Sequence, residues 1–597
     1  MANYDDDANV TKLELNKLSP SMCMAKWLQV SLHLPQGRTH SCYHPPTHPI
    51  PLDELKDNPN ALHNTKFKLE ERRQMKEGER PKGCQYCWNV EDANKDALSD
   101  RHYRSSEWWV KDAWEEVVQQ PWDHDIKPRY VEVNFNQACN FKCSYCSPHL
   151  STAWEDDIKQ HGSFRFSDGG GHNNIQELKT IGLMPLEVAR KDNPYIEAFW
   201  KWFPETYSNL KIFRMTGGEP LMDKNTFKVL DYIRDNPNPD LEVSMTTNMC
   251  PPDDALFDKF IEKVKLLEKP VIDENDPTVT PVNFKDLLFK TPPPNKRSVL
   301  FYAVDPGDGS SWNEWKQYII EETLHGVDPW LIQPNVDTLP SSEIKQKFKG
   351  VGPCEDEDNN SFLYLNNYEK DKEWNKWTHL FENVSVKHIS VFISVDGIGP
   401  QAEYIRDGLD WEKLKTNVDR LLSETSRVSV TFINTFNMLS IPSLRGFLDY
   451  ILELREKYGY VYQVDNGHKV LQQKIWFDVP YMRDPSWFNI QVADSEMLQV
   501  IQDNIDYMKE KVLPDEEYGK SFLGFKNYEV LKLERDLAWA EQGIEISDDD
   551  LSDRLIRFYE FFSQYDKRRG FDFLETFPEF TEFWNEAKEE YIEKYSP

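Results

Sequence analysis

Between residues 128 and 490, short apolar segments alternate with segments that carry apolar residues at helical spacing. Six segments are rich in β-branched and aromatic residues, which favours strands; they span residues 129–136, 209–216, 241–247, 388–395, 427–434 and 472–479. Between several of them, amphipathic helices are predicted over residues 226–235, 411–424 and 443–457. Repeated strand–helix units of this kind form parallel sheets. The pattern therefore predicts an α/β fold, and six strands predict a partial (βα)6 barrel rather than a closed eight-stranded one.

Different patterns flank this barrel region and interrupt it. The first part of the chain is rich in Pro, His and Cys and only weakly periodic, whereas the last part is helix-like, with apolar residues three and four apart. Inside the barrel region, Pro and Gly punctuation follows a predicted helix from Ala255 to Leu267 and indicates an insertion with some structure of its own. We expect an N-terminal Cys-rich module at 1–125, a barrel at 126–490 with an insertion at about 268–385, and a C-terminal helical cap at 491–597.

Charge and apolar content limit the partners that we expect. The chain has 70 basic and 102 acidic residues, a net charge of −32, which opposes binding to the phosphates of nucleic acid. The first ten residues, MANYDDDANV, lack the features of a secretory signal, and no run of 18 apolar residues occurs. We therefore expect a cytoplasmic protein with no membrane association. Its nine cysteines are then expected to serve as thiols for metal binding or catalysis rather than as disulfides.

Three cysteines with the spacing C-x3-C-x2-C lie just beyond the first barrel strand, in the segment CNFKCSYC: Cys139, Cys143 and Cys146. A loop at the carboxyl end of a barrel strand faces the usual position of an active site. Three thiolates hold three irons of a four-iron cluster and leave the fourth iron open to a small molecule with an amine and a carboxylate. The alternatives are a structural zinc site, which normally needs a fourth Cys or His, and coincidence.

Four more cysteines occur in two pairs near the N-terminus. Cys23 and Cys42 stand in a C-x13-G-x4-C arrangement, in which residues 28–34 alternate as a strand and Gly37 lies in the turn of a predicted hairpin. Cys84 and Cys87 form a C-x2-C pair, which can grip one metal or cluster from a single turn. The two pairs make a complete four-thiolate set, and their spacing alone suits structural zinc as well as an iron-sulfur cluster.

The segment CNFKCSYC resembles the signature of the radical S-adenosylmethionine superfamily, and the resemblance extends over residues 128–490. It implies a [4Fe-4S] cluster on the three cysteines of the signature, bound S-adenosylmethionine and an electron donor such as a flavodoxin or ferredoxin. The segment TGGEP after the second strand looks like the family motif that contacts the methionine amino group: Thr216, Gly217, Gly218, Glu219 and Pro220. The alternative for this segment is a simple strand-ending turn.

The same resemblance implies further contacts to S-adenosylmethionine at the ends of later strands. The third strand ends in TTN, where Thr247 and Asn248 are similar to residues that reach the ribose hydroxyls. The fourth ends in SVDG, with Ser394 and Asp396, and Arg406 follows ten residues after Asp396, as in relatives where an arginine pairs with the methionine carboxylate. Arg406 equally suits a surface salt bridge. Asn434 at the end of the fifth strand suits an adenine or ribose contact, or a strand-end cap.

The N-terminal cysteine pattern resembles the twitch or SPASM auxiliary-cluster module of many members of this superfamily. The resemblance implies an auxiliary [4Fe-4S] cluster on Cys23, Cys42, Cys84 and Cys87, with zinc as the alternative. Such a module normally follows the barrel, whereas here it precedes it, so the pattern leaves open whether its cluster meets the substrate or braces the fold. The nearby histidines are interpreted as loop residues that could also act as ligands; they are His40, His44 and His48.

Three further features of the sequence are two isolated cysteines and an aromatic C-terminal segment. Cys250 is interpreted as a buried packing residue, and Cys354 has no partner at ligand spacing. The C-terminal segment 561–584 looks like the tail of uncharacterised bacterial and phage twitch-domain radical enzymes. Its aromatic residues are expected to form a core, and Arg568 and Arg569 a solvated turn.

Two functions follow as hypotheses. The first is a radical enzyme that cleaves S-adenosylmethionine reductively and abstracts hydrogen from a small molecule or a peptide, with a slight preference for a small molecule because no peptide-clasping domain is recognisable. The alternative is a non-catalytic structural or interaction protein that holds zinc or clusters on the same scaffold.

Overall fold

The computed structural model describes residues 4–268, 385–425, 427–465, 468–513 and 523–595, and the backbone of five short strands between residues 298 and 366. The chain divides into two compact units. The first comprises residues 1–269, 385–513 and 521–597, and the second comprises residues 270–384 and 514–520. Most of the predicted insertion thus lies outside the described residues.

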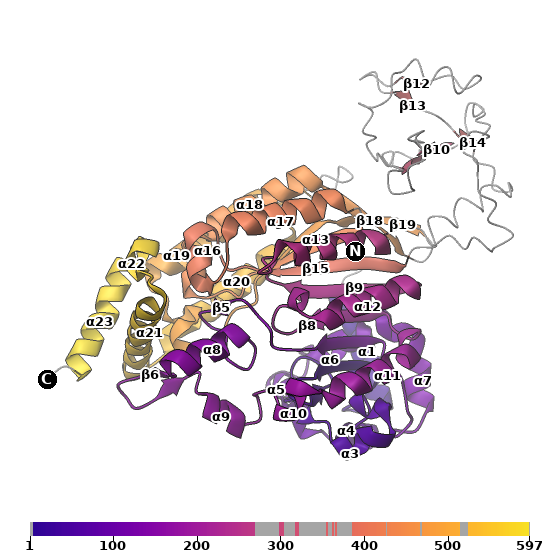
Figure 1. The fold of residues 1–597 in the computed structure, drawn as a ribbon, viewed down its shortest axis with the longest axis horizontal. Helices are drawn as coiled ribbons and strands as arrows, with labels where there is room; N and C mark the ends of the chain where they lie inside the picture. The colour runs from indigo at the N-terminus through magenta and orange to yellow at the C-terminus, as the bar shows by residue number, and fades with distance from the viewer. Residues whose placement is uncertain are drawn as a thin grey trace. The chain divides into compact units, whose positions relative to one another are not determined.

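A largely parallel nine-stranded sheet forms the centre of the first unit (Figure 1). Its strand order is β20-β17-β15-β9-β8-β4-β1-β2-β3. The six strands from β4 to β20 are parallel neighbours, and each coincides with a predicted strand: β4 (Tyr130–Asn134), β8 (Ile212–Thr216), β9 (Asn238–Thr247), β15 (Val386–Ser394), β17 (Val428–Ile433) and β20 (Ile475–Asp478). The predicted α/β class is confirmed.

Helices connect these strands, as the apolar spacing predicts. They are α12 (Lys224–Asp235), α13 (Asp254–Leu267), α17 (Trp411–Glu424) and α18 (Leu444–Tyr458). The first three begin after an aspartate whose side chain accepts a backbone N–H of the first turn: Asp223, Asp253 and Asp410. Such caps satisfy helix donors that would otherwise have no partner. The apolar faces of all four helices pack into one large core with the sheet.

The N-terminal residues add three strands and several helices to the sheet edge. β1 (Gln29–His33) pairs in parallel with β4 and in antiparallel with β2 (Arg38–His40), which pairs with β3 (His48–Pro49). The predicted hairpin is therefore present, and Gly37 in its turn has a φ of +60°. The helices are α1 (Tyr4–Leu18), α2 (Ala25–Leu28), α3 (Leu52–Asp57), α4 (Lys66–Lys76), α5 (Gln85–Ala93), α6 (Asp100–Ser106) and α7 (Trp114–Gln119). Leu55 of α3 joins the main core, whereas a second, smaller core with Trp27, Trp88 and Trp109 lies among the other helices.

The C-terminal residues form the helices α19 (Ser495–Glu510), α20 (Asn527–Glu541), α21 (Asp548–Arg569), α22 (Phe573–Thr576) and α23 (Thr581–Tyr595). Their aromatic side chains join the main core, as predicted. The prediction of a solvated turn at Arg568 and Arg569 is wrong, because these side chains are only 10% and 1% exposed. No helix in the described part of the chain is both long and apolar enough to cross a membrane.

The other described elements are connections and short pairs. They are β5 (Lys142–Cys143), α8 (Thr152–His161), β6 (Phe164–Arg165), β7 (Gly171–His172), α9 (Ile175–Thr180), α10 (Glu187–Lys191), α11 (Pro194–Tyr207), α16 (Gly399–Ile405), β16 (Arg406–Asp407), β18 (Tyr460–Asp465) and β19 (His468–Gln473). The second unit contains β10 (Ser298–Ala303), β11 (Gln317–Glu321), β12 (Cys354–Glu355), β13 (Ser361–Phe362) and β14 (Leu365–Asn366). Figure 1 shows β6 close to α21, and Phe164 of β6 packs on Phe561 of α21 with ring centroids 4.6 Å apart.

Candidate functional site

The three predicted cluster cysteines lie in the loop that follows β4. Cys143 belongs to β5, which pairs in antiparallel with β16, so that Cys143 lies opposite Arg406. The loop is held by backbone groups: the Cys146 N–H donates to the Cys143 carbonyl at 2.8 Å, and the indole of Trp154 donates to the same oxygen at 2.9 Å. Burial raises the pKa of the Cys139 thiol to about 12, and the neighbouring Cys143 adds to this shift.

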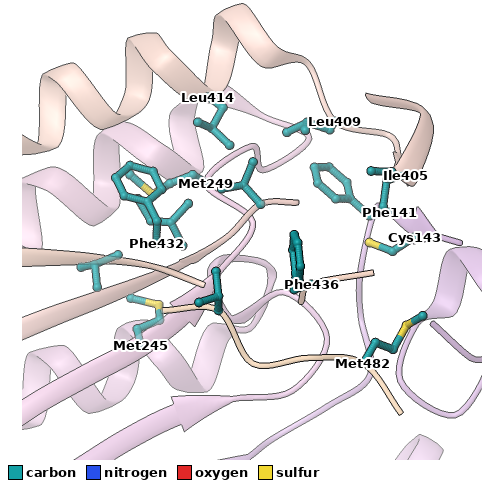
Figure 2. Packing of buried hydrophobic residues seen from close by; sticks show 14 of the residues in the cluster. Phe141, Cys143, Met245, Met249, Ile405, Leu409, Leu414, Phe432, Phe436 and Met482 are labelled. Carbon is teal, nitrogen blue, oxygen red and sulfur yellow. The ribbon is translucent and has the colours of Figure 1, made fainter. Parts of the chain in front are cut away.

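Apolar side chains surround Cys143 (Figure 2). Phe141 and Ile405 lie near it, and its sulfur is turned toward the side of Phe436 in this view. All four belong to the main buried core. An apolar environment of this kind excludes water and strengthens electrostatic interactions at the thiol.

The TGGEP segment packs directly against the loop that leads to Cys139. A Cβ on Gly217, whose φ is +125°, would lie 2.9 Å from the Asn136 carbonyl oxygen, and a Cβ on Gly218 would lie 2.2 Å from the Ala138 carbonyl oxygen. The Glu219 N–H donates to that same Ala138 oxygen at 2.6 Å. Only glycine allows so close an approach of two backbones. The two motifs that are separate in the sequence therefore form one structure.

The Glu219 carboxylate fixes the end of β9. It accepts hydrogen bonds from the Thr247 hydroxyl and the Asn248 N–H, both at 2.7 Å. It also accepts the Leu221 N–H at 3.0 Å. Burial raises the pKa of Glu219 to about 7, although these three hydrogen bonds oppose the shift. The TGGEP and TTN segments are thus joined through one buried carboxylate.

Asp396 and Arg406 form a buried ion pair, with 2.8 Å between Nε and Oδ2 and side chains that are 0% and 7% exposed. Arg406 is therefore not in a surface salt bridge. Its Nη1 also lies 3.7 Å from the Cys143 sulfur. Asp396 further accepts the Tyr145 hydroxyl at 2.7 Å and the Thr435 N–H at 2.8 Å. These contacts place a cationic guanidinium beside the central thiol of the loop.

Asn434, at the end of β17, is completely buried, and both polar atoms of its side chain lack a hydrogen-bond partner. Its backbone N–H donates to Asp478, so the side chain is not used as a strand cap. A buried amide without partners is costly and is expected where a ligand supplies the missing hydrogen bonds. Thr216 and Ser394 are half-buried at the ends of β8 and β15. The predicted S-adenosylmethionine contacts therefore all lie at the carboxyl edge of the sheet.

The four N-terminal cysteines line a single pocket. Cys23 precedes α2, Cys42 follows β2, and Cys84 and Cys87 lie at the start of α5. Burial raises the pKa of the Cys42 thiol to about 12, and the charge of Cys23 adds to this shift. The remaining lining residues include cationic side chains and two aromatic rings: Ala25, Lys26, Ser41, His44, Pro45, Met75, Tyr86, Trp88, Asp100, Arg101 and Arg104.

The histidines of this region occupy different positions. His44 lines the pocket, where it stacks on Tyr86 with ring centroids 3.7 Å apart and pairs with Asp100. His40 and His48 are in β2 and β3 rather than in a loop. His48 hydrogen-bonds Thr65 at 2.9 Å.

Sequence reasoning missed the charged residues of the pocket wall. Lys26 and Glu71 form a buried ion pair at 2.6 Å, and Arg101 pairs with Glu91 at 2.7 Å. Glu71 belongs to α4, whose buried residues Lys68, Glu71, Arg72 and Met75 have the spacing of one helical face. The helical spacing of these residues could have indicated a buried face. The face is mostly charged, however, so a search for periodic apolar residues does not find it.

The two cysteine sets lie at opposite ends of neighbouring strands. β1 pairs in parallel with β4, with Gln29 opposite Tyr130 and His33 opposite Asn134. Cys23 precedes the start of β1, whereas Cys139 follows the end of β4. A contact at the tip of the β1–β2 hairpin agrees with this placement of the two sets. There the Gln36 side chain donates to the carbonyl of His149, three residues after Cys146, at 3.3 Å. At about 3.3 Å per residue, a five-residue strand separates the two sets by roughly 13 Å or more.

The remaining cysteines contribute to neither set. Cys250 is 3% exposed, and its sulfur lies 3.5 Å from the Asp410 carbonyl, in accord with a packing role. Cys354 has no described side chain. None of the eight described cysteines forms a disulfide with another described cysteine.

No three His, Cys, Asp or Glu side chains in the described ranges converge on a point that would hold one metal ion. Comparisons of this chain with protein-family models, curated proteins and solved structures found no match.

Proposed function

We propose that this chain is a radical S-adenosylmethionine enzyme. The observation that carries the proposal is the convergence of three cysteines, two close-packed glycines and the partnerless, fully buried Asn434 at one edge of a parallel sheet. Ligands of parallel α/β sheets bind at this carboxyl edge. In this proposal the six parallel strands form the partial barrel of the superfamily, and the C-terminal helices close it.

The donor set at this edge suits a [4Fe-4S] cluster on Cys139, Cys143 and Cys146. Three thiolates hold three irons, and one iron remains open to the amine and carboxylate of S-adenosylmethionine. Cys139, Cys143 and Cys146 would hold the cluster, which would supply one electron for reductive cleavage of the sulfonium and so allow hydrogen abstraction from a substrate.

Residues of the chain would position S-adenosylmethionine and keep water away. The backbone at Gly217 and Gly218 would approach the methionine amino group. Glu219 would hold Thr247 and Asn248 toward the ribose, and the free amide of Asn434 would bind the ribose or adenine. Arg406 would attract the methionine carboxylate, with its charge shared between that group and Asp396. Precise positioning of this kind accounts for much of the catalytic effect that a protein adds to a cofactor.

We propose an auxiliary [4Fe-4S] cluster at Cys23, Cys42, Cys84 and Cys87. The four thiols line one pocket, and four thiolates are the donor set of such a cluster. The same donor set also suits structural zinc, and the iron analysis below distinguishes the two. Because this pocket lies at the amino edge of the sheet, its cluster would not touch the substrate.

The test is anaerobic purification, reconstitution with iron and sulfide, and quantification of 5'-deoxyadenosine after addition of dithionite and S-adenosylmethionine. Formation of the nucleoside with about eight irons per chain is the expected result. About four irons with turnover would keep the radical chemistry and assign the N-terminal cysteines to zinc. A colourless chain with stoichiometric zinc and no deoxyadenosine would refute the proposal in favour of a non-catalytic scaffold.

A further inference from the structure

Lys26 is a buried cation in the wall of the four-cysteine pocket. Its side chain is 2% exposed, and its ammonium group lies 2.6 Å from the Glu71 carboxylate. The ion pair with Glu71 keeps Lys26 charged, and Lys26 lines the same pocket as Cys84.

The backbone beside Cys84 is built around this ion pair. A Cβ on Gly83 would lie 2.5 Å from Oε1 of Glu71, so the absence of a side chain at Gly83 lets the carboxylate reach the ligand turn. Glu71 therefore contacts both Lys26 and the turn that carries Cys84 and Cys87. The Lys26–Glu71 ion pair lies beside the ligands of the group that the four thiolates would bind.

Two more basic side chains are buried near Lys26, and burial lowers the pKa of one of them, Lys68, well below its ordinary value. Lys68 and Arg72 are both 0% exposed, and they donate to the carbonyls of Gln29 and Lys26 and contact His63. Neither forms an ion pair within the described ranges. Burial lowers the pKa of Arg72 only to about 9, so its guanidinium keeps its charge at neutral pH. A buried positive charge without a carboxylate requires another source of negative charge nearby.

We propose that Lys26 is a positioning residue that sets the reduction potential of the group bound by the four N-terminal cysteines, and that Glu71 opposes it. This inference rests on the proposed auxiliary cluster. Four thiolates give either a zinc ion or a [4Fe-4S] cluster net negative charge, and the buried charges of Lys26 and Arg72 oppose it. Net charge and hydrogen bonds to the sulfurs are the features that set the potential of an iron-sulfur cluster.

The direction of each effect follows from electrostatics. The reduced cluster carries one more negative charge than the oxidised cluster, so a nearby cation stabilises the reduced form and a nearby anion destabilises it. Loss of the Lys26 charge therefore lowers the reduction potential, whereas loss of the Glu71 charge raises it. A pair that merely braces the fold would not produce shifts of opposite sign.

The test uses the full chain with Cys139, Cys143 and Cys146 all replaced by Ala, so that only the N-terminal cluster titrates. Potentials are measured by titration monitored with electron paramagnetic resonance in Lys26→Met, Lys26→Arg, Glu71→Gln and the double variant Lys26→Met/Glu71→Gln. Lys82→Met is the matched control, because Lys82 is an exposed lysine two residues from Cys84 and its charge is screened by solvent.

We expect Lys26→Met to shift the reduction equilibrium about tenfold toward the oxidised form, about 59 mV for one electron. Glu71→Gln should shift it in the opposite direction, and the double variant should return close to the parent. Lys26→Arg and Lys82→Met should stay near the parent value. If Lys26→Met does not fold, the comparison of Glu71→Gln with the double variant still tests Lys26, because loss of the Lys26 charge should reverse the shift that Glu71→Gln produces.

Shifts of the same sign, or no shift, in Lys26→Met and Glu71→Gln would overturn the inference. Zinc without iron in the triple-alanine chain would also overturn it and would remove the auxiliary cluster from the proposed function. Deoxyadenosine formation by the intact chain depends on the other cysteine set, so that measurement tests the radical chemistry independently.

Discussion

The guanidinium of Arg569 lies 2.9 Å from the Asp407 carboxylate, at the point where the last turn of α21 meets β16. It also lies 3.6 Å from Asp157 of α8, and its guanidinium packs over the rings of Trp154 and Tyr565. β16 carries Arg406 and pairs with β5, which carries Cys143. α21 therefore supports the loop that carries Cys143 through one buried cation.

Replacement of Arg569 by Met should destabilise the chain and lower the iron content of the carboxyl-edge site. It removes one cation from the buried Asp157 and from Asp407, which is 18% exposed. Removal of one partner from a buried ion pair costs about 3–5 kcal/mol, and the loss should be smaller here because Lys142 lies within 4 Å of both carboxylates. Chemical denaturation and iron analysis measure both effects. Lys567→Met, an exposed position on the same helix, is the control. Equal stability of the two variants would contradict the assigned role of Arg569.

Replacement of Cys143 by Ala should abolish deoxyadenosine formation and remove about four of eight irons. The N-terminal metal should remain, because its four cysteines lie at the other end of β1 and β4. Metal analysis and the cleavage assay follow the two properties separately. Cys250→Ala changes a packing cysteine and should keep both clusters. Loss of all metal from the Cys143 variant would argue against two independent sites.

Replacement of Gly218 by Ala should impair S-adenosylmethionine cleavage more than its small size suggests. The added Cβ would lie 2.2 Å from the Ala138 carbonyl oxygen, so the backbone just before Cys139 must move. A displacement of about 1 Å at a catalytic site can cost about a hundredfold in rate. Gly170→Ala is the control, since its nearest atom would belong to the flexible Asp168 side chain. Equal cleavage rates in both variants would rule out this steric explanation.

Glu219 should make the metal-free chain less stable as the pH rises. Burial raises the pKa of Glu219 from 4.5 to about 7, so between these values the unfolded chain releases a proton that the folded chain keeps. Stability from this group is full below pH 4.5, falls by roughly 3 kcal/mol between pH 4.5 and about pH 7 at 1.36 kcal/mol per pKa unit, and is lost above that range.

Unfolding at several pH values in the wild type and Glu219→Gln tests this linkage. The difference in unfolding free energy, wild type minus variant, should decrease from pH 4.5 to pH 7. A difference that is constant or that increases over this range would show that Glu219 is charged in the folded chain.

Replacement of Asn434 by Leu should weaken S-adenosylmethionine binding without destabilising the ligand-free chain. The Asn434 amide is buried without partners, and an unsatisfied buried polar group costs about 1–3 kcal/mol. Asn504→Leu is the matched control, because Asn504 is also buried but bonds Arg445 and Val500. That control should lose stability and retain binding. Calorimetry measures S-adenosylmethionine binding and thermal unfolding measures stability in both variants. Unchanged binding in Asn434→Leu would show that Asn434 does not belong to the binding site.

Much of the barrel region could be predicted from local pattern. The six strands are short apolar segments, and helices such as α12 and α17 have one apolar face and an aspartate cap, so their formation depends on near neighbours in the sequence. α4 was not predicted because its buried face carries Lys68, Glu71 and Arg72. Arg569 was misassigned for the same reason, since a charged side chain is normally exposed unless distant residues neutralise it.

The sequence by itself determined the chemistry available to this protein: two cysteine sets with ligand spacing, a double glycine and polar residues at strand ends. Spacing along the chain reports such local donor sets, because their members are held by one loop or one turn. Only the tertiary structure decided that the two sets lie at opposite ends of β1 and β4, and that Lys26, which lines the four-cysteine pocket, forms a buried ion pair with Glu71. Strand direction and the burial of paired charges depend on contacts between segments far apart in the sequence, and no local pattern encodes them.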